Sequence, residues 1–94
     1  MEGLYEWDED KAELNLVAHG VSFAEAVKVF DDAGALEEYD ARHSHDEPRY
    51  SRIGFSGMRL LFVVFTVRGD KTRIIHARKA DRIMERLYAR HQTR

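Results

Sequence analysis

The chain has 94 residues, of which 44% are hydrophobic and 34% charged, a composition that fits one compact domain and excludes a disordered chain. It has no cysteine, which excludes disulfides and thiolate metal sites, and no apolar run near the roughly 20 residues of a membrane span. The formal net charge is -2, yet residues 1–48 carry three basic and 14 acidic residues, net -11, whereas residues 49–94 carry 12 basic and three acidic residues, net +9.

A short strand over residues 2–6 and a first helix are expected at the start of the acidic half. Asp8 should cap this helix, because its carboxylate can accept a hydrogen bond from the backbone of the first turn. The helix should end at His19, since Gly20 can adopt the left-handed conformation that closes many helices. Its apolar stripe is expected at Ala12, Leu16 and Val17.

A second helix is expected immediately afterwards. Residues 22–25, Ser-Phe-Ala-Glu, match the capping box, in which the serine and the glutamate each bond to a free backbone N–H. The helix should end at residues 31–34, Asp-Asp-Ala-Gly. Its apolar face has helical spacing and should cover something broad and flat. The residues of that face are Phe23, Ala26, Val27 and Phe30.

Beyond residue 34 the hydrophobic pattern becomes that of strands. Residues 60–67, LLFVVFTV, form a continuous apolar run, which is typical of a central strand covered on both faces. The turn at residues 68–71, RGDK, is short enough to predict an antiparallel hairpin with the last strand. The expected strands are 35–39 at an edge, 49–55, 60–67 and 72–79, with a polar loop at 42–48.

A closing helix capped by Asp81 is predicted after the last strand. Its apolar stripe is expected at Ile83, Met84, Leu87 and Tyr88, with Arg82, Arg86 and Arg90 off that stripe. The order of elements predicts an α+β fold in a single domain, residues 1–94. This fold has two N-terminal helices, an antiparallel β-sheet meander and a closing C-terminal helix.

Several separated motifs follow one another along nearly the whole chain. They are Trp7-Asp8-x-x-Lys11-Ala12-x-x-Asn15-x-x-x-His19-Gly20-Val21-x-Phe23-x-x-Ala26, Phe30-Asp31-Asp32, Arg49 with Ile53-Gly54, Thr66-x-Arg68, Arg73-Ile74-Ile75-x-Ala77-Arg78-Lys79-Ala80 and Glu85-x-x-Tyr88. This set of motifs resembles the BrnT family of toxins. The resemblance implies a ribonuclease toxin with a RelE-like fold. It also implies a BrnA-type antitoxin encoded beside the toxin, through which the pair binds operator DNA.

Two positions depart from the pattern of that family. His76 stands where the family usually has serine, and Ala18 stands where a basic residue is common before the His-Gly pair. His76 therefore adds a titratable group to the expected active surface.

Cleavage of RNA without a metal requires a base for the 2′-hydroxyl, cations for a phosphorane-like transition state and an acid for the leaving oxygen. Arginine suits phosphate because its planar fork donates two parallel hydrogen bonds and keeps its charge. Strand alternation predicts Arg73 and Lys79 on one face and His76 and Arg78 on the other, so they cannot all contact one phosphate from an ideal strand. Arg78 and Lys79, near the strand end, can still converge through the turn into the closing helix. The candidate catalytic residues are Arg73, His76, Arg78, Glu85 and Tyr88.

Each candidate has a structural alternative. Arg73 and Arg78 can form ion pairs with the acidic half of the chain, and Glu85 can organise ion pairs among neighbouring arginines. Tyr88 can serve as a core tyrosine with its hydroxyl at the rim of the sheet. His76 can be a strand residue without a chemical role.

The candidate RNA-binding residues are Lys11, His19, Arg49, Lys79 and Arg82. Lys11, Asn15 and His19 recur at i, i+4 and i+8, so they form a polar ridge that lines a cleft or faces water. His19 can instead bond the last carbonyls of its helix and interact with the helix dipole. Lys79 and Arg82 can equally form a solvated face. Residues 43–46, His-Ser-His-Asp, lack further ligands at metal spacing, so we expect an exposed loop and no metal or cofactor.

The leading hypothesis is an endoribonuclease toxin of the cytoplasm that acts by metal-independent transesterification. An antitoxin would inhibit it by covering the basic surface in a hetero-oligomer. The alternative is a non-catalytic interaction module that acts as partner and co-repressor of a DNA-binding antitoxin. A freestanding nucleic-acid binder is disfavoured by the acidic first half. No membrane association is expected.

Overall fold

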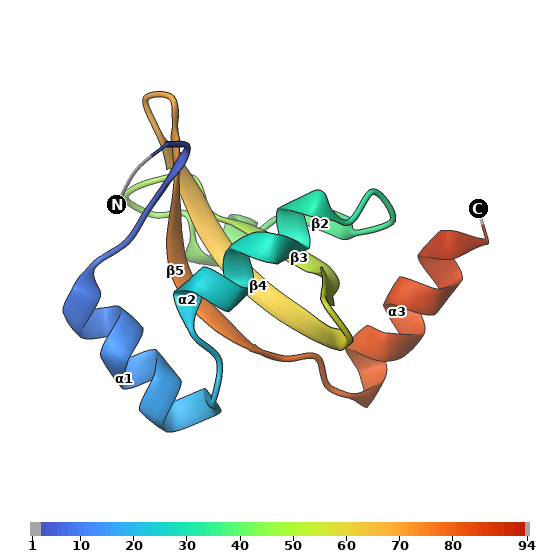
Figure 1. The fold of residues 1–94 in the computed structure, drawn as a ribbon. Coiled ribbons are helices and arrows are strands. Elements are labelled where there is room, and N and C mark those ends of the chain that lie inside the picture. Colours follow the sequence, from blue (N-terminus) through green and yellow to red (C-terminus); the bar gives the residue numbers. More distant parts are fainter. Residues whose placement is uncertain (1–2, 94) are drawn as a thin grey trace.

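The protein is an α+β domain in which helices cover one face of a five-stranded sheet (Figure 1). The computed structural model describes residues 3–93. In chain order the elements are β1 (Tyr5–Glu6), α1 (Glu9–His19), α2 (Phe23–Val27), the 3-10 helix η1 (Lys28–Asp31), β2 (Leu36–Tyr39), the 3-10 helix η2 (Ala41–His43), β3 (Tyr50–Ser56), β4 (Arg59–Arg68), β5 (Lys71–Lys79) and α3 (Arg82–Gln92). The predicted α+β class is confirmed.

The sheet has the strand order β1-β5-β4-β3-β2. Strands β2 to β5 form the predicted antiparallel meander, with β2 at one edge. Strand β1 pairs in parallel with β5, so the sheet is mixed and not wholly antiparallel as expected. A parallel pair is possible here because most of the chain lies between the two strands, whereas a short hairpin would allow only an antiparallel pair. Of the strand predicted at residues 2–6, the first residue lies outside the described part of the chain.

Side-chain caps begin all three α-helices as predicted. The Asp8, Ser22 and Asp81 side chains accept hydrogen bonds from backbone N–H groups at 3.0, 3.0 and 2.9 Å. Gly20 closes α1 in the left-handed region, with φ 69°. The glutamate of the capping box pairs with another residue instead, since the Glu25 carboxylate lies 3.1 Å from the Arg59 guanidinium.

The core lies between the sheet and the segment that contains α2 and η1. This segment tightens from an α-helix into a 3-10 helix, which places every third residue on the same side. Phe23, Ala26 and Val29 are consequently buried, while the predicted Val27 and Phe30 pack at the margin of the core. The buried core residues are Val21, Phe23, Ala26, Val29, Leu61, Val63, Phe65, Ile74 and Ala77.

The second face of the sheet is less covered than the apolar run in β4 predicts. Residues 61, 63 and 65 are buried on the helix side, whereas the alternate residues Leu60, Phe62 and Val64 are only half-buried. Helices α1 and α2 lie on one side of the sheet and α3 extends beyond its end (Figure 1). We call the side that carries Leu60, Phe62 and Val64 the open face. Ile53 and Thr66 lie on this same face and are buried, so the prediction of covering on both faces is confirmed only in part.

The apolar stripes predicted for α1 and α3 are only partly buried: Ala12, Met84 and Tyr88 are half-buried, and the other members are exposed. Leu16 and Val17 of α1 are 48% and 83% exposed, because this helix contacts the sheet through the polar Asn15. In α3, Ile83 and Leu87 are 68% and 40% exposed, and the helix has no buried residue. Among the described residues, no helix has the length and apolar character needed to cross a membrane.

Candidate active site

A β-bulge in β5 decides which side chains share the open face. Val64 pairs with His76 and the next residue, Phe65, pairs with Ile74, so Ile75 is an extra residue in β5. Ile74 and Ala77 both face the core, although they are three residues apart. The bulge therefore interrupts the alternation of side chains along the strand.

This interruption places three candidate catalytic residues on one side of the sheet. Arg73 precedes the inward Ile74, while His76 and Arg78 flank the inward Ala77. Strict alternation had separated Arg73 from His76 and Arg78, and that prediction was wrong because it lacked the bulge. We call Arg73, His76 and Arg78, with the His19 ring that contacts His76, the basic cluster.

The two arginines of the basic cluster differ in how firmly they are held. Arg73 pairs with Glu6 at 3.1 Å across the β1–β5 pair, with both side chains about one quarter exposed, at 26% and 27%. The Arg78 guanidinium carbon lies 4.9 Å from the centroid of the Phe62 ring. Its nearest carboxylate is that of Asp81 at 3.8 Å, which is a weak contact. Arg78 is thus the more available of the two for an anion.

His19 and His76 bring two imidazole rings into contact. Their ring centroids are 4.9 Å apart and the rings are nearly perpendicular, at 82°. Burial, the charge of His19 and the charge of Arg78 lower the pKa of His76 below its ordinary value. The neutral form of His76 is therefore favoured near pH 7, which is the form that accepts a proton. His19 lies at the carboxyl end of α1.

Asn15 positions His19 by fixing α1 to the sheet. Its amide nitrogen donates to the carbonyls of Val21 and Ala77 at 3.0 and 2.8 Å, and its amide oxygen accepts from the Ala77 N–H at 3.2 Å. Asn15 thus satisfies the free edge of β5 where β1 has ended. The polar ridge on α1 points toward the sheet at Asn15 and His19, while Lys11 remains exposed.

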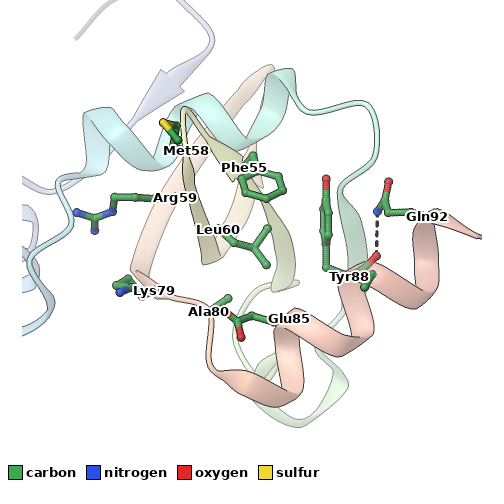
Figure 2. A pocket seen from close by; sticks show the side chains of 10 residues that line it. Phe55, Met58, Arg59, Leu60, Lys79, Ala80, Glu85, Tyr88 and Gln92 are labelled. Atoms are coloured by element: carbon green, nitrogen blue, oxygen red, sulfur yellow. Dashed lines mark hydrogen bonds between the residues drawn. The ribbon is translucent and has the colours of Figure 1, made fainter.

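Glu85 and Tyr88 lie in a different place, a hollow of about 700 Å³ between α3 and the β3–β4 hairpin. Figure 2 shows the Glu85 carboxylate, the Tyr88 ring and Phe55 around this space, which we call the α3 hollow. Its lining residues are Phe55, Met58, Arg59, Leu60, Lys79, Ala80, Glu85, Tyr88, Ala89 and Gln92. Within residues 3–93, no side-chain hydrogen bond, ion pair or ring contact links Glu85 or Tyr88 to the basic cluster.

The Tyr88 hydroxyl is already engaged. It donates to the Asp32 carboxylate at 2.8 Å, and burial together with this bond raises the pKa of Tyr88. Burial opposes ionisation of Asp32, yet hydrogen bonds from the Phe55 backbone, Tyr88 and the Gly34 backbone lower its pKa overall. The Tyr88 and Phe55 rings pack edge to face, with their centroids 5.3 Å apart. The structural alternative for Tyr88 is therefore well supported.

The other candidate RNA-binding residues are spread over both ends of the sheet. Arg49 precedes β3 and lines a small hollow with His43, His45, Asp46 and Glu47. Lys79 and Arg82 lie at the opposite end, where β5 passes into α3, and both are exposed. The structure does not bring Arg49 together with Lys79 and Arg82.

Sequence reasoning missed three residues that shape these sites. Glu6 holds Arg73, Phe62 supports Arg78, and Asp32 anchors Tyr88. The Asp31-Asp32 motif was visible, but nothing in it indicated a tyrosine partner 56 residues away. Phe62 is hidden inside an apolar run in which alternate residues look alike.

Comparison with known proteins agrees with the motif pattern. A family model described as ribonuclease toxin, BrnT, of type II toxin-antitoxin system matches residues 7–83. The matched segment contains the whole basic cluster and ends before Glu85 and Tyr88. A search of curated proteins finds no match. Because the family model covers most of the chain, this protein belongs to the BrnT family of ribonuclease toxins of type II toxin-antitoxin systems.

Proposed function

We propose that the protein is an endoribonuclease that cleaves RNA by metal-independent transesterification at the basic cluster. The observation that carries the proposal is the β-bulge, because it gathers Arg73, His76 and Arg78 on the open face beside the His19 ring. Two fixed cations and two titratable rings are the groups that this reaction needs.

In the proposed reaction, neutral His76 accepts the proton of the 2′-hydroxyl as the 2′-oxygen bonds to phosphorus. Arg78 and Arg73 hold the non-bridging oxygens and oppose the charge that develops on them. The bond from phosphorus to the 5′-oxygen breaks, and protonated His19 supplies the proton for that oxygen. The products are a 2′,3′-cyclic phosphate and a 5′-hydroxyl. After product release, His76 loses the proton that it accepted and His19 regains the one that it donated, so both rings return to their starting states.

The partner is proposed to be a BrnA-type antitoxin, which inhibits by covering the open face. Half-buried Phe62 and Val64 beside the basic cluster offer apolar and charged contacts to such a partner. Operator DNA would be bound through the antitoxin. The helices on one face of the β2–β5 meander, with a closing helix, support a RelE-like fold.

Arg78→Ala tests this function most directly. The purified chain is expected to cleave single-stranded RNA in excess EDTA and to leave 2′,3′-cyclic ends. The variant should be slower by roughly 100- to 1,000-fold, because one donor to the developing oxyanion is lost. Arg86→Ala, an exposed arginine on α3, is the matched control and should retain the activity. Intact RNA under every condition, including with ribosomes present, would favour the non-catalytic alternative.

A further inference from the structure

Two lining residues of the α3 hollow, Phe55 and Leu60, lie on the same face of the sheet as the basic cluster. Phe55 and Leu60 pair across β3 and β4, and Leu60 is two residues before Phe62 along β4. Residues two apart on a strand share a face and lie about 7 Å apart. Phe62 in turn pairs with Arg78, and Val64 pairs with His76. The floor of the hollow therefore continues directly into the basic cluster.

The rim of the hollow is connected to the cluster through the chain as well. Lys79 and Ala80 line the hollow and directly follow Arg78. The Ala80 N–H donates to the Leu60 carbonyl at 2.9 Å, which holds this rim against the sheet. An RNA strand with one phosphate at Arg78 would thus place a neighbouring nucleotide over the hollow.

The hollow combines a flat apolar wall with one free carboxylate. Phe55 is 41% exposed, and the Tyr88 ring is held in place by the bond from its hydroxyl to Asp32. Within residues 3–93, the Glu85 carboxylate forms no ion pair and accepts no hydrogen bond. A free carboxylate repels a phosphate, so beside an RNA strand it is favourable only where it meets hydrogen-bond donors.

We propose that the α3 hollow binds a guanine base of the RNA substrate, next to the nucleotide whose phosphate contacts Arg78, and that Glu85 reads its edge. The guanine Watson–Crick edge presents two adjacent donors, N1–H and the N2 amino group, which match the two oxygens of a carboxylate. The other bases offer a single donor group on that edge. Stacking on aromatic side chains with hydrogen bonds to an exposed edge is the usual way in which proteins read single-stranded RNA.

The proposal rests on the RNA substrate of the proposed function, but its test needs no cleavage. The probes are two 2′-O-methyl hexanucleotides, one of adenosines only and one with a single internal guanosine. The 2′-O-methyl group prevents transesterification and leaves the base edges intact. We expect the guanosine probe to bind about 10-fold more tightly in a fluorescence anisotropy titration, within the range of a good bidentate base contact. Backbone NMR signals of Phe55, Leu60 and Glu85 should shift with that probe.

Glu85→Gln is the decisive variant, because an amide presents only one acceptor to the guanine edge. It should lower the ratio of the two affinities to near one. Glu13→Gln makes the same substitution on the exposed side of α1 and should leave the ratio unchanged. Equal affinities in the unmodified chain, or a preference that survives in Glu85→Gln, would overturn the proposal.

Two further outcomes separate this proposal from the proposed function. A chain that leaves ordinary RNA intact but prefers the guanosine probe refutes the activity and retains the base site. A chain that cleaves RNA but binds both probes equally retains the activity and loses the base site. If the signals of the hollow respond to the antitoxin and to neither probe, the hollow is a protein-docking surface and the base site is refuted.

Discussion

The two helices that border the end of β5 are attached in different ways. Helix α1 is fixed by the buried Asn15, which makes three hydrogen bonds, two of them to the backbone of Ala77. Helix α3 has no buried residue and is held by the Tyr88 hydroxyl and the Gln92 amide, which bond to Asp32 and Gly34. The α1 side is therefore rigidly positioned, whereas the α3 side leaves a large hollow.

We relate this difference to the two tasks proposed above. Proton transfer requires groups held at fixed separation, and α1 presses the His19 ring against His76. Recognition of a base requires an accessible apolar wall, and α3 leaves Phe55 and Glu85 accessible beside the sheet. Breaking each attachment in turn should affect stability, chemistry and affinity to different degrees.

Asn15→Leu should have the largest effect, on the α1 side. Leucine has a similar size, but it leaves the N–H and C=O of Ala77 and the carbonyl of Val21 without their partner. We expect the free energy of unfolding to fall by about 3–5 kcal/mol, because each unsatisfied buried group costs roughly 1–3 kcal/mol. Urea unfolding measures this change. Leu14→Ala on the exposed side of α1 should stay within about 0.5 kcal/mol of the parent.

His76→Gln tests the chemistry that α1 is proposed to support. Cleavage by the unmodified chain should rise with pH through a pKa below 6.5, because only neutral His76 accepts the proton. The variant should lose this rising limb and roughly 100-fold or more in kcat/KM. A rising limb that persists in His76→Gln would exclude His76 as the base.

The same group makes a prediction for stability. The pKa of His76 is lower in the folded chain than its ordinary value of 6.5, so the unfolded chain binds more protons between these two values. Stability should therefore be lost as the pH falls below about 6.5 toward the folded pKa. His76→Gln should show a smaller loss over this window when the two chains are compared by urea unfolding.

The ends of the helices and strands could be predicted because they depend on local chemistry. Asp8, Ser22 and Asp81 cap helices through their own side chains, and Gly20 closes α1 through its own conformational freedom. These effects extend over three or four residues, so the sequence alone contains them.

The arrangement of the candidate site could not be predicted, because it depends on partners far away in the sequence. Ile74 and Ile75 are both apolar, and nothing local tells which of them faces the core, so the bulge was invisible. In the sequence Asn15 has the character of a surface residue, because its partner Ala77 on the edge of β5 lies 62 residues later. The sequence suggested the candidate residues, but their grouping into a cluster and a separate hollow required the structure.

Tyr88→Phe should loosen the α3 side with a moderate effect. The change removes the hydroxyl that donates to Asp32, whereas Asp32 keeps the N–H groups of Phe55 and Gly34 as donors. We expect a loss of about 1–2 kcal/mol in the free energy of unfolding, typical of one hydrogen bond to a charged group. A fall in kcat with no loss of stability would instead indicate that the Tyr88 hydroxyl takes part in the reaction.

Glu6→Gln should have the smallest effect and concerns the α1 side. If Arg73 binds RNA as proposed, the Glu6 carboxylate competes with RNA for it. The ion pair is partly exposed, so its loss should change stability by less than about 1 kcal/mol. Release of Arg73 should tighten RNA binding by roughly 1.5- to 5-fold, and the gain should diminish at high salt. Glu37→Gln is the matched control, because it releases Arg52, whose guanidinium bonds the Val29 and Asp32 carbonyls on the covered face. Equal gains in the two variants would mean that general charge, and not the position of Arg73 on the open face, controls RNA binding.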